Sequence, residues 1–350
     1  MPQRLATPAR EGKRDPLVAE TVSPFSGNVS LAAYKPGMDL RSRVLTAFMT
    51  ARRVIPAFPI FALAFSLAAC GSAQPPPAAP AHASAASLDG MFEVHDGLAM
   101  HLHCIGSGSP TVVLDAGFGV SGTGWQHTQR AMAENTRVCA YDRLGAGHSD
   151  PAPRPHTFAQ LTSELRTLLA KAGVDGPYVL VAHSIAGLIA RLYAVEHPGD
   201  VAGVVLVDAS SEDQDAMWKL LPPEAANMFE DRDSREGFTF ATVQDGMARL
   251  RAANRSLGDK PLVVLTAGRM DGPPDMPPET QKKMADLWRE LQAAYERLST
   301  NSAHVIAPKS GHFMESDEPR LVIAAVRQAV EAARTHGRVN AAALEAVVRK

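Results

Sequence analysis

Short apolar runs alternate with longer amphipathic stretches from about residue 91 onwards. The runs are rich in Val, Leu and Ala, which is typical of buried strands. Between them, apolar residues recur at helical spacing, as in residues 158–172 and 187–196. This alternation predicts a mainly parallel sheet covered by helices. Eight strands are predicted, at residues 91–95, 98–104, 111–114, 137–141, 178–182, 201–207, 261–266 and 303–307.

One long stretch, at about residues 210–260, interrupts this rhythm. It carries aromatic residues and methionines, such as Trp218 and Phe238, among charged residues. An insertion that follows a strand tip in this way predicts a small helical cap. Residues 336–350 predict an added amphipathic helix, so that residues 88–350 form the folded domain.

The start of the chain has a different pattern. Arg52 and Arg53 are followed by an apolar stretch and then by Leu67-Ala-Ala-Cys70. Residues 49–69 therefore resemble a bacterial lipoprotein signal, in which Cys70 would become the lipidated first residue of the mature protein. The apolar stretch is shorter than the roughly 18 residues of a spanning helix, so it predicts a cleaved signal.

A signal of this kind works at an N-terminus, so we expect translation to begin at Met49 and residues 1–48 to precede the true start. A start at Met38 would lengthen the charged region. Residues 70–87 are almost entirely Ala, Pro and Ser after the cysteine, and they predict a semi-extended linker. The resemblance implies an exported protein, lipid-anchored to a bacterial membrane on its periplasmic or outer-membrane face.

Composition narrows the class of protein. The 350 residues are 45% hydrophobic and carry a formal net charge of -2. This is an ordinary composition for a globular domain with a large core. It lacks the clustered basic residues that neutralise phosphates, so nucleic acid is excluded as a partner.

The most specific chemical signal is a serine in a strand-to-helix turn. Residues 179–187 read VLVAHSIAG, with Ser184 directly after the apolar run. A serine in this turn is exposed above the sheet edge, where a histidine can take its proton. The usual pattern is G-x-S-x-G, and here the small flanking residues are Ala182 and Ala186.

Residues 91–333 resemble the α/β-hydrolase superfamily through several motifs. Beside the serine turn, residues 141–149 (YDRLGAGHS) match the family's Y-D-x-x-G-x-G-x-S turn after the fourth strand. Residues 114–119 (LDAGFG) stand where relatives carry the loop that binds the oxyanion. The resemblance implies a mostly parallel eight-stranded sheet flanked by helices. It also implies an oxyanion hole formed by the backbone N–H groups of Phe118 and Ile185.

Residues 308–313 (PKSGHF) resemble the family's histidine loop after the last strand, which makes His312 the expected base. His304 opens that strand and lies at the wrong end, and His183 is expected to pack or to line the pocket. His101 and His103 lie two apart on one strand, and without a second ligand cluster they predict a surface pair rather than a metal site. No metal or other cofactor is expected.

The two remaining cysteines are expected to form a disulfide. An exported protein favours oxidised cysteines, and the resemblance makes the strands that carry Cys104 and Cys139 neighbours.

Two aspartates compete for the role of the triad acid. Asp208 stands at the tip of the strand at 201–207, and Asp271 follows the next strand in an irregular loop. Relatives use either location. A carboxylate that orients His312 must be held in place, which slightly favours Asp208.

The predicted function is hydrolysis of carboxylic esters through a Ser-His-Asp triad and an acyl-enzyme. The apolar residues of the cap favour a small-molecule ester with an apolar acyl or aryl group. Two enzymatic alternatives share the fold, a cofactor-free haloperoxidase or perhydrolase and an aminopeptidase. The nonenzymatic alternative is a surface-tethered binding protein on a hydrolase scaffold.

Overall fold

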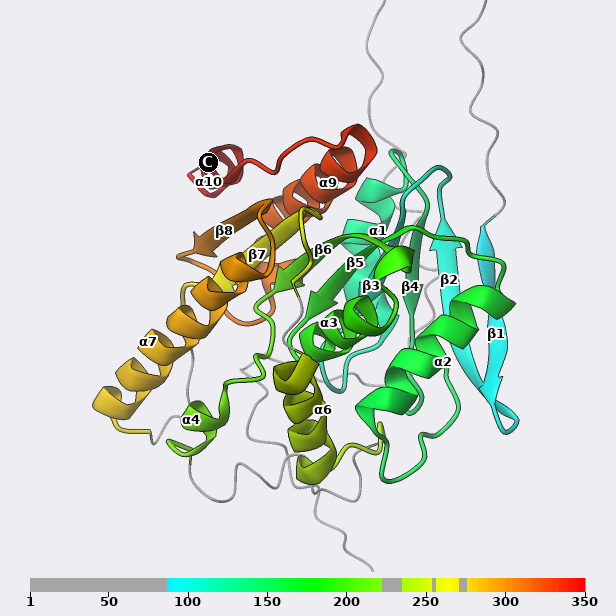
Figure 1. The fold of residues 1–350 in the computed structure, drawn as a ribbon, viewed down its shortest axis with the longest axis horizontal. Coiled ribbons are helices and arrows are strands. Elements are labelled where there is room, and N and C mark those ends of the chain that lie inside the picture. Colours follow the sequence, from blue (N-terminus) through cyan, green and yellow to red (C-terminus); the bar gives the residue numbers. More distant parts are fainter. Residues whose placement is uncertain (1–86, 222–234, 254–255, 271–275, 350) are drawn as a thin grey trace, which may run out of the picture. The chain divides into compact units, whose positions relative to one another are not determined.

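An eight-stranded sheet organises the protein, as seen in a computed structural model that describes residues 87–221, 235–253, 256–270 and 276–349 (Figure 1). The strand order is β1-β2-β4-β3-β5-β6-β7-β8. The strands pair in parallel from β4 to β8, whereas β2 is antiparallel to both β1 and β4. The strands are β1 Leu88–His95, β2 Leu98–Ile105, β3 Thr111–Asp115, β4 Val138–Tyr141, β5 Tyr178–His183, β6 Val201–Val207, β7 Leu262–Ala267 and β8 Ser302–Ala307.

All eight predicted strands are confirmed, with ends that shift by up to a few residues. The largest difference is at β1, where antiparallel pairing of Leu88 with Cys104 extends the strand toward its N-terminus. Every residue of β3, β4 and β5 is buried. Strands buried on both faces are typical of a parallel sheet enclosed by helices, which explains why they read as continuous apolar runs.

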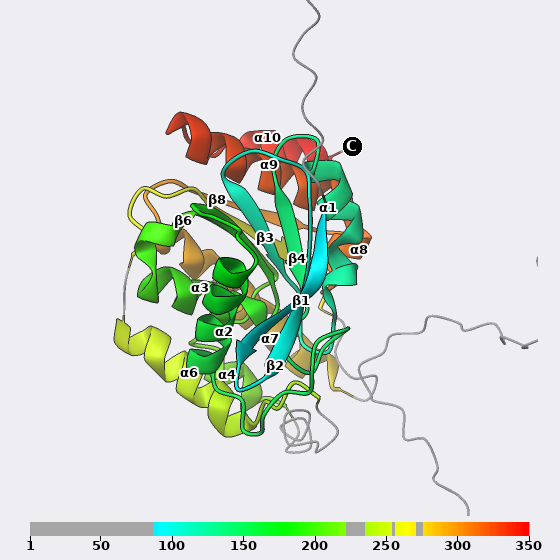
Figure 2. The same ribbon diagram turned by 90° about the vertical axis from the view of Figure 1, so that its right-hand side faces the viewer.

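Helices cover both faces of the sheet (Figure 2). The described helices are α1 Gln126–Met132, α2 Phe158–Lys171, α3 Ala186–Glu196, α4 Asp215–Trp218, α6 Phe240–Ala253, α7 Pro278–Ala294, α8 Met314–Asp317, α9 Pro319–Thr335 and α10 Ala341–Val348. Residues of α2 and α3 form one core cluster with one face of the strands. Residues of α1, α9 and α10 form a second cluster with the opposite face.

Two helices of the expected cap, α4 and α6, lie between β6 and β7. The α6 helix packs on α2 and α3 through an apolar cluster that includes Phe158, Ile185 and Phe238. The approach is close, because a Cβ atom at Gly246 would lie 2.6 Å from the Phe158 ring. The cap is therefore continuous with the apolar surface beside Ser184.

The C-terminal helix begins later than predicted. His336 adopts a left-handed conformation (φ 52°) and ends α9, so the helix expected from residue 336 does not start there. Instead α10 begins at Ala341, where the side chain of Asn340 accepts a hydrogen bond from the Ala343 N–H. This N-cap fixes the start of the helix.

The predicted disulfide is present between Cys104 and Cys139. The two residues are direct partners in the β2–β4 register, so the bridge joins neighbouring strands. Residues 1–86, which include the expected signal segment, Cys70 and nearly all of the linker, lie outside the described residues. Within the described part of the chain, no helix has the length and apolar character needed to cross a membrane.

Candidate active site

Ser184 occupies the sharp turn between β5 and α3. Its φ is +55°, a value rarely adopted by residues other than glycine. Its N–H donates to the Val207 carbonyl (3.2 Å), and its carbonyl accepts from the N–H groups of Gly187 and Ser210 (2.9 Å each). Ser184 is partly exposed while His183 and Ile185 on either side are buried. This strained turn presents the hydroxyl at the sheet edge, as a nucleophile requires.

The turn requires a glycine at Gly187, and not at the two glycine positions of the G-x-S-x-G motif. Ala182 and Ala186 are fully buried and their methyl groups are accommodated. Gly187 is the position without room, because a Cβ atom there would lie 2.5 Å from the Cβ of Ala209. The departure from G-x-S-x-G is therefore compatible with the packing of α3 against the segment after β6.

His312 and Asp208 are hydrogen-bonded, with His312 Nδ1 2.7 Å from Asp208 Oδ2. The other carboxylate oxygen, Oδ1, accepts from the Ala267 N–H (3.0 Å) and from the indole N–H of Trp288 (2.7 Å). Asp208 is buried, whereas the His312 side chain is 45% exposed. The carboxylate is thus held by three donors and directed at the imidazole. Asp271, the other predicted acid, lies outside the described residues.

His183 connects the serine turn to the histidine loop. Its Nε2–H donates to the His312 carbonyl (2.8 Å), and the two rings have centroids 4.6 Å apart. Burial, with a smaller contribution from His312, holds the pKa of His183 well below 6.5, so its ring is neutral. The expectation that His183 packs rather than reacts agrees with this position.

Glu315 is a buried acid next to this connection. Its Oε1 lies 3.5 Å from His183 Nδ1. Burial raises the pKa of Glu315 to about 7. Glu315 was not predicted from the sequence, because nothing in the local pattern distinguishes it from an ordinary polar residue at the start of a helix.

The loop after β3 packs directly over the serine turn. A Cβ atom at Gly117 would lie 2.9 Å from His183 Nδ1 and 3.4 Å from Ser184 Cβ. The next residue, Phe118, has its ring 5.6 Å from that of Phe238 in the cap. Only glycine permits this contact between loop and turn without displacement, and Phe118 directly follows it in the chain.

A buried charge network fixes the same loop. The guanidinium of Arg143 donates from Nη1 to the carboxylate of Asp115 and to the Ala116 carbonyl, and from Nη2 to the Gly117 carbonyl (2.8 Å). Its Nε donates to Glu236 (2.7 Å). Arg143 therefore binds backbone carbonyls of the loop and the Asp115 side chain before it. These partners compensate the cost of burying the positive charge of Arg143.

Glu236 completes this network from the cap. One oxygen accepts from Arg143, and the other accepts from the Gly119 N–H at 2.6 Å. Glu236 is 2% exposed. The residue was not predicted, since it is 93 positions from Arg143 and no local pattern links them. Arg143 belongs to the YDRLGAGHS motif, and this motif is the feature of the sequence that could have indicated a role for Arg143 near the site.

One group of described side chains has the donor set for a metal ion. It consists of His101, Asp142 and His148. His101 was expected to form a surface pair with His103, but the structure instead groups His101 with the turn after β4. Asp142 and His148 come from that turn.

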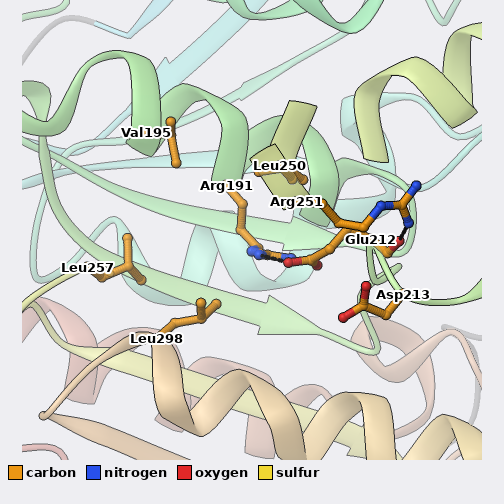
Figure 3. Close-up of a pocket in the computed structure, with 8 residues that line it drawn as sticks. All are labelled: Arg191, Val195, Glu212, Asp213, Leu250, Arg251, Leu257 and Leu298. Carbon is orange, nitrogen blue, oxygen red and sulfur yellow. Dashed lines mark hydrogen bonds and ion pairs between the residues drawn. The ribbon is translucent and has the colours of Figure 1, made fainter. Parts of the chain in front are cut away.

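A separate cavity of about 250 Å³ lies between α3, α6 and the segment after β6 (Figure 3). Arg191 and Glu212 form an ion pair in it, and Arg191 lies 4.8 Å from the centre of the Tyr295 ring. Its lining residues are Arg191, Val195, Glu212, Asp213, Leu250, Arg251, Leu257 and Leu298. Ser184, Asp208 and His312 are absent from this lining, so the cavity is distinct from their site.

The chain is similar to known proteins along most of the described domain. The family model of the alpha/beta hydrolase fold matches residues 110–326. The uncharacterized protein YqjL of Bacillus subtilis is 31% identical over 233 residues, which cover 66% of this chain and 88% of YqjL.

Solved structures agree on the fold. Haloalkane dehalogenase DbeA of Bradyrhizobium elkani superposes with a TM-score of 0.55 at 15% identity, covering 72% of this chain and all of DbeA. A thermophilic esterase from Thermogutta terrifontis gives a TM-score of 0.51 at 20% identity, covering 71% of this chain and 99% of the esterase. With this strand order, serine turn and family match, the chain belongs to the α/β-hydrolase family.

Proposed function

We propose that this hydrolase cleaves carboxylic esters, with Ser184 as nucleophile, His312 as base and Asp208 as the acid of the triad. The observation that carries the proposal is the 2.7 Å contact between His312 Nδ1 and Asp208 Oδ2, with the second oxygen of Asp208 held by two further donors. A carboxylate on Nδ1 leaves Nε2 free of a proton, which is the tautomer that can accept one from a serine.

The reaction follows from these roles. Ser184 Oγ attacks the ester carbonyl while His312 Nε2 takes the hydroxyl proton, and the resulting tetrahedral oxyanion is bound by the N–H groups of Phe118 and Ile185. His312 then gives the proton to the leaving alcohol, and an acyl-enzyme remains on Ser184. Water, deprotonated by His312, hydrolyses the acyl-enzyme and returns the serine.

The surroundings of the site favour an apolar acyl or aryl group. Ile185 and Phe238 are buried in one apolar cluster, and the Phe118 side chain packs against it. Ester specificity over amide or peroxide chemistry is part of the proposal, since a perhydrolase or an aminopeptidase of this fold would use the same three residues. A turnover comparison between p-nitrophenyl esters and aminoacyl p-nitroanilides distinguishes the esterase from the aminopeptidase.

A fluorophosphonate probe tests the nucleophile. We expect covalent labelling of the wild type and none of Ser184→Ala, and a fall in p-nitrophenyl ester turnover of about 10⁴-fold or more in that variant. Ser163→Ala is the matched control, because Ser163 is exposed on α2. A folded wild type that is not labelled would contradict the proposal and favour a tethered binding protein.

We further propose that the mature protein is exported and anchored through a lipid on Cys70. Support comes from the Leu67-Ala-Ala-Cys70 motif after an apolar stretch and from the Ala- and Pro-rich linker. Isotopically labelled palmitate should enter the wild type in bacterial cells and should not enter Cys70→Ala. Equal labelling of both proteins would overturn the anchor without affecting the triad.

A further inference from the structure

Three metal-ligating side chains converge where β2 meets the turn that follows β4. His101 Nδ1 and His148 Nδ1 each lie 3.4 Å from Asp142 Oδ2. All three ligand atoms lie within 4.8 Å of one another. Asp142 is buried, His101 is 20% exposed and His148 is 71% exposed. We propose that these residues form a binding site for a divalent transition metal ion of the Zn²⁺ class.

Two of the three separations suit ligands of a single ion. Two ligands at about 2.0–2.1 Å from a tetrahedral Zn²⁺ are about 3.4 Å apart. Both imidazole–carboxylate distances in the cluster have this value. Two imidazole nitrogens with one carboxylate oxygen form a donor set that suits zinc and leaves a fourth position for water.

Asp89 orients His101 for ligation. His101 Nε2 lies 2.7 Å from Asp89 Oδ1, and because a carboxylate only accepts, Nε2 carries the proton. In the neutral imidazole this leaves a lone pair on Nδ1, which faces the carboxylate of Asp142. A metal ion between Nδ1 and this carboxylate would bind both acceptors. A carboxylate that accepts from the far nitrogen of a ligating histidine is the usual outer partner of a zinc site.

The backbone holds the ligands in place. The His101 carbonyl accepts from the Asp142 N–H (3.0 Å), and the His148 N–H donates to Asp142 Oδ2 (2.9 Å). Gly147, with φ of +51°, lets the turn pass over the carboxylate, since a Cβ atom there would lie 2.1 Å from Asp142 Oδ2. The turn therefore brings His148 onto Asp142 before any ion binds, so little ordering is needed for ligation.

The site is open to an ion and connected to the loop that precedes η1 (Gly122–Trp125). Asp89, His101 and Asp142 line a cavity of about 310 Å³. The second oxygen of Asp142 accepts from the Gly122 N–H at 2.6 Å. An ion on Oδ2 would thus fix the same carboxylate that anchors the start of η1, where the loop after β3 ends, and we assign the ion a structural role.

Calorimetric titration of chelator-treated protein with ZnCl₂ tests the site. We expect one ion per wild-type chain and at least 10-fold weaker binding in His148→Ala and in His101→Ala. Asp89→Asn should weaken binding by about 10-fold without changing the stoichiometry, as removal of an outer partner does. His103→Ala is the matched control, because His103 lies on the same strand two residues from His101 and lines the same cavity.

His148 is largely exposed, so its replacement should leave the fold intact, and unchanged thermal unfolding without metal verifies this. With ZnCl₂ the wild-type Tm should rise and that of His148→Ala should not. Equal affinity of the wild type and His148→Ala would overturn the site, as would an equal loss in His103→Ala. The titration does not depend on turnover, so its outcome is independent of the proposed esterase activity.

Discussion

Both carboxylate oxygens of Asp208 have hydrogen-bond partners that fix its orientation. Trp288 and the Ala267 N–H bind Oδ1, which leaves Oδ2 for His312. The residue follows β6 directly and has a φ of +42°. Because the strand tip, the indole and the backbone amide all restrict the carboxylate, it can orient an imidazole without reorganising during the reaction.

Replacement of this carboxylate by an amide should be far more costly than the same change at the competing aspartate. In Asp208→Asn we expect kcat for p-nitrophenyl esters to fall about 10⁴-fold, because an amide favours the wrong tautomer of His312. Asp271→Asn should change kcat by less than about 3-fold. The opposite ranking of the two variants would assign the acid to Asp271.

Glu315 makes stability depend on pH in an unusual direction. Its folded pKa of about 7 is raised from 4.5 by burial, near His312, Asp317 and Asp208. The folded state therefore binds the proton more tightly, so the contribution of Glu315 to stability is present below pH 4.5 and is lost as the pH rises through 7. The loss is up to about 3 kcal/mol.

Urea unfolding of the wild type and Glu315→Gln between pH 5 and 8 measures this effect. The wild type should lose free energy of unfolding relative to the variant as the pH rises. A difference between the two that stays constant across this range would show that Glu315 has an ordinary pKa in the folded protein.

At the scale of elements, the loop after β3 is held by residues distant in sequence. Arg143 from the turn after β4 and Glu236 from the cap bind its carbonyls and the Gly119 N–H. Within the loop the Val120 N–H donates to the Gly117 carbonyl (3.2 Å), and these distant side chains supply further hydrogen bonds to it. The carboxylate of Glu236 compensates the charge of Arg143, and both are buried.

Loss of this compensation should affect catalysis and stability together. For Glu236→Gln we expect kcat to fall about 10-fold with little change in KM, because under the proposed function the loop after β3 binds the oxyanion, and loosening it weakens transition-state binding. Stability should fall by about 3 kcal/mol, as when one partner of a buried pair is removed. Ester kinetics and urea unfolding measure the two effects.

Glu212→Gln is the matched control, since it breaks the Arg191–Glu212 pair beside a different cavity. It should lower stability and leave kcat nearly unchanged. If both variants lowered kcat equally, the effect would be one of general destabilisation rather than of loop position.

The positions of candidate site residues could be predicted from the sequence where these residues follow a strand that the sequence itself identifies. Ser184, His312 and Asp208 each follow a strand that reads as an apolar run, so their location at one sheet edge could be predicted. Trp288 and Glu236 could not be predicted, because they reach the site from a helix surface and a cap loop by contacts that only the packed chain creates. The grouping of His148 with His101 likewise depends on β2 pairing with β4.

At the scale of the whole described domain, two apolar cores enclose the sheet from either side. The bridge between Cys104 and Cys139 ties β2, near one edge, to β4 in the interior of the sheet. The bridge therefore restrains the antiparallel end of the sheet, which consists of β1 and β2, against the parallel strands.

Removal of the bridge should destabilise the domain without abolishing its fold. The cysteines are 35 residues apart, and closing a loop of that length stabilises a protein by about 3 to 4 kcal/mol in the chain-entropy account. Urea unfolding of the Cys104→Ala/Cys139→Ala variant measures the loss. In a Cys70→Ala background, thiol titration of the unfolded protein should find no free thiol before reduction and two afterwards; two thiols before reduction would disprove the bridge.

The position of Glu236 has a consequence for attempts to redesign the enzyme. The cap is inserted between β6 and β7, so it could be exchanged as a module. Here the cap also supplies a carboxylate that a buried arginine of the scaffold requires. A transplanted cap without an acid at this place would leave that arginine uncompensated. Exchange of the cap therefore has to retain the Glu236–Arg143 pair.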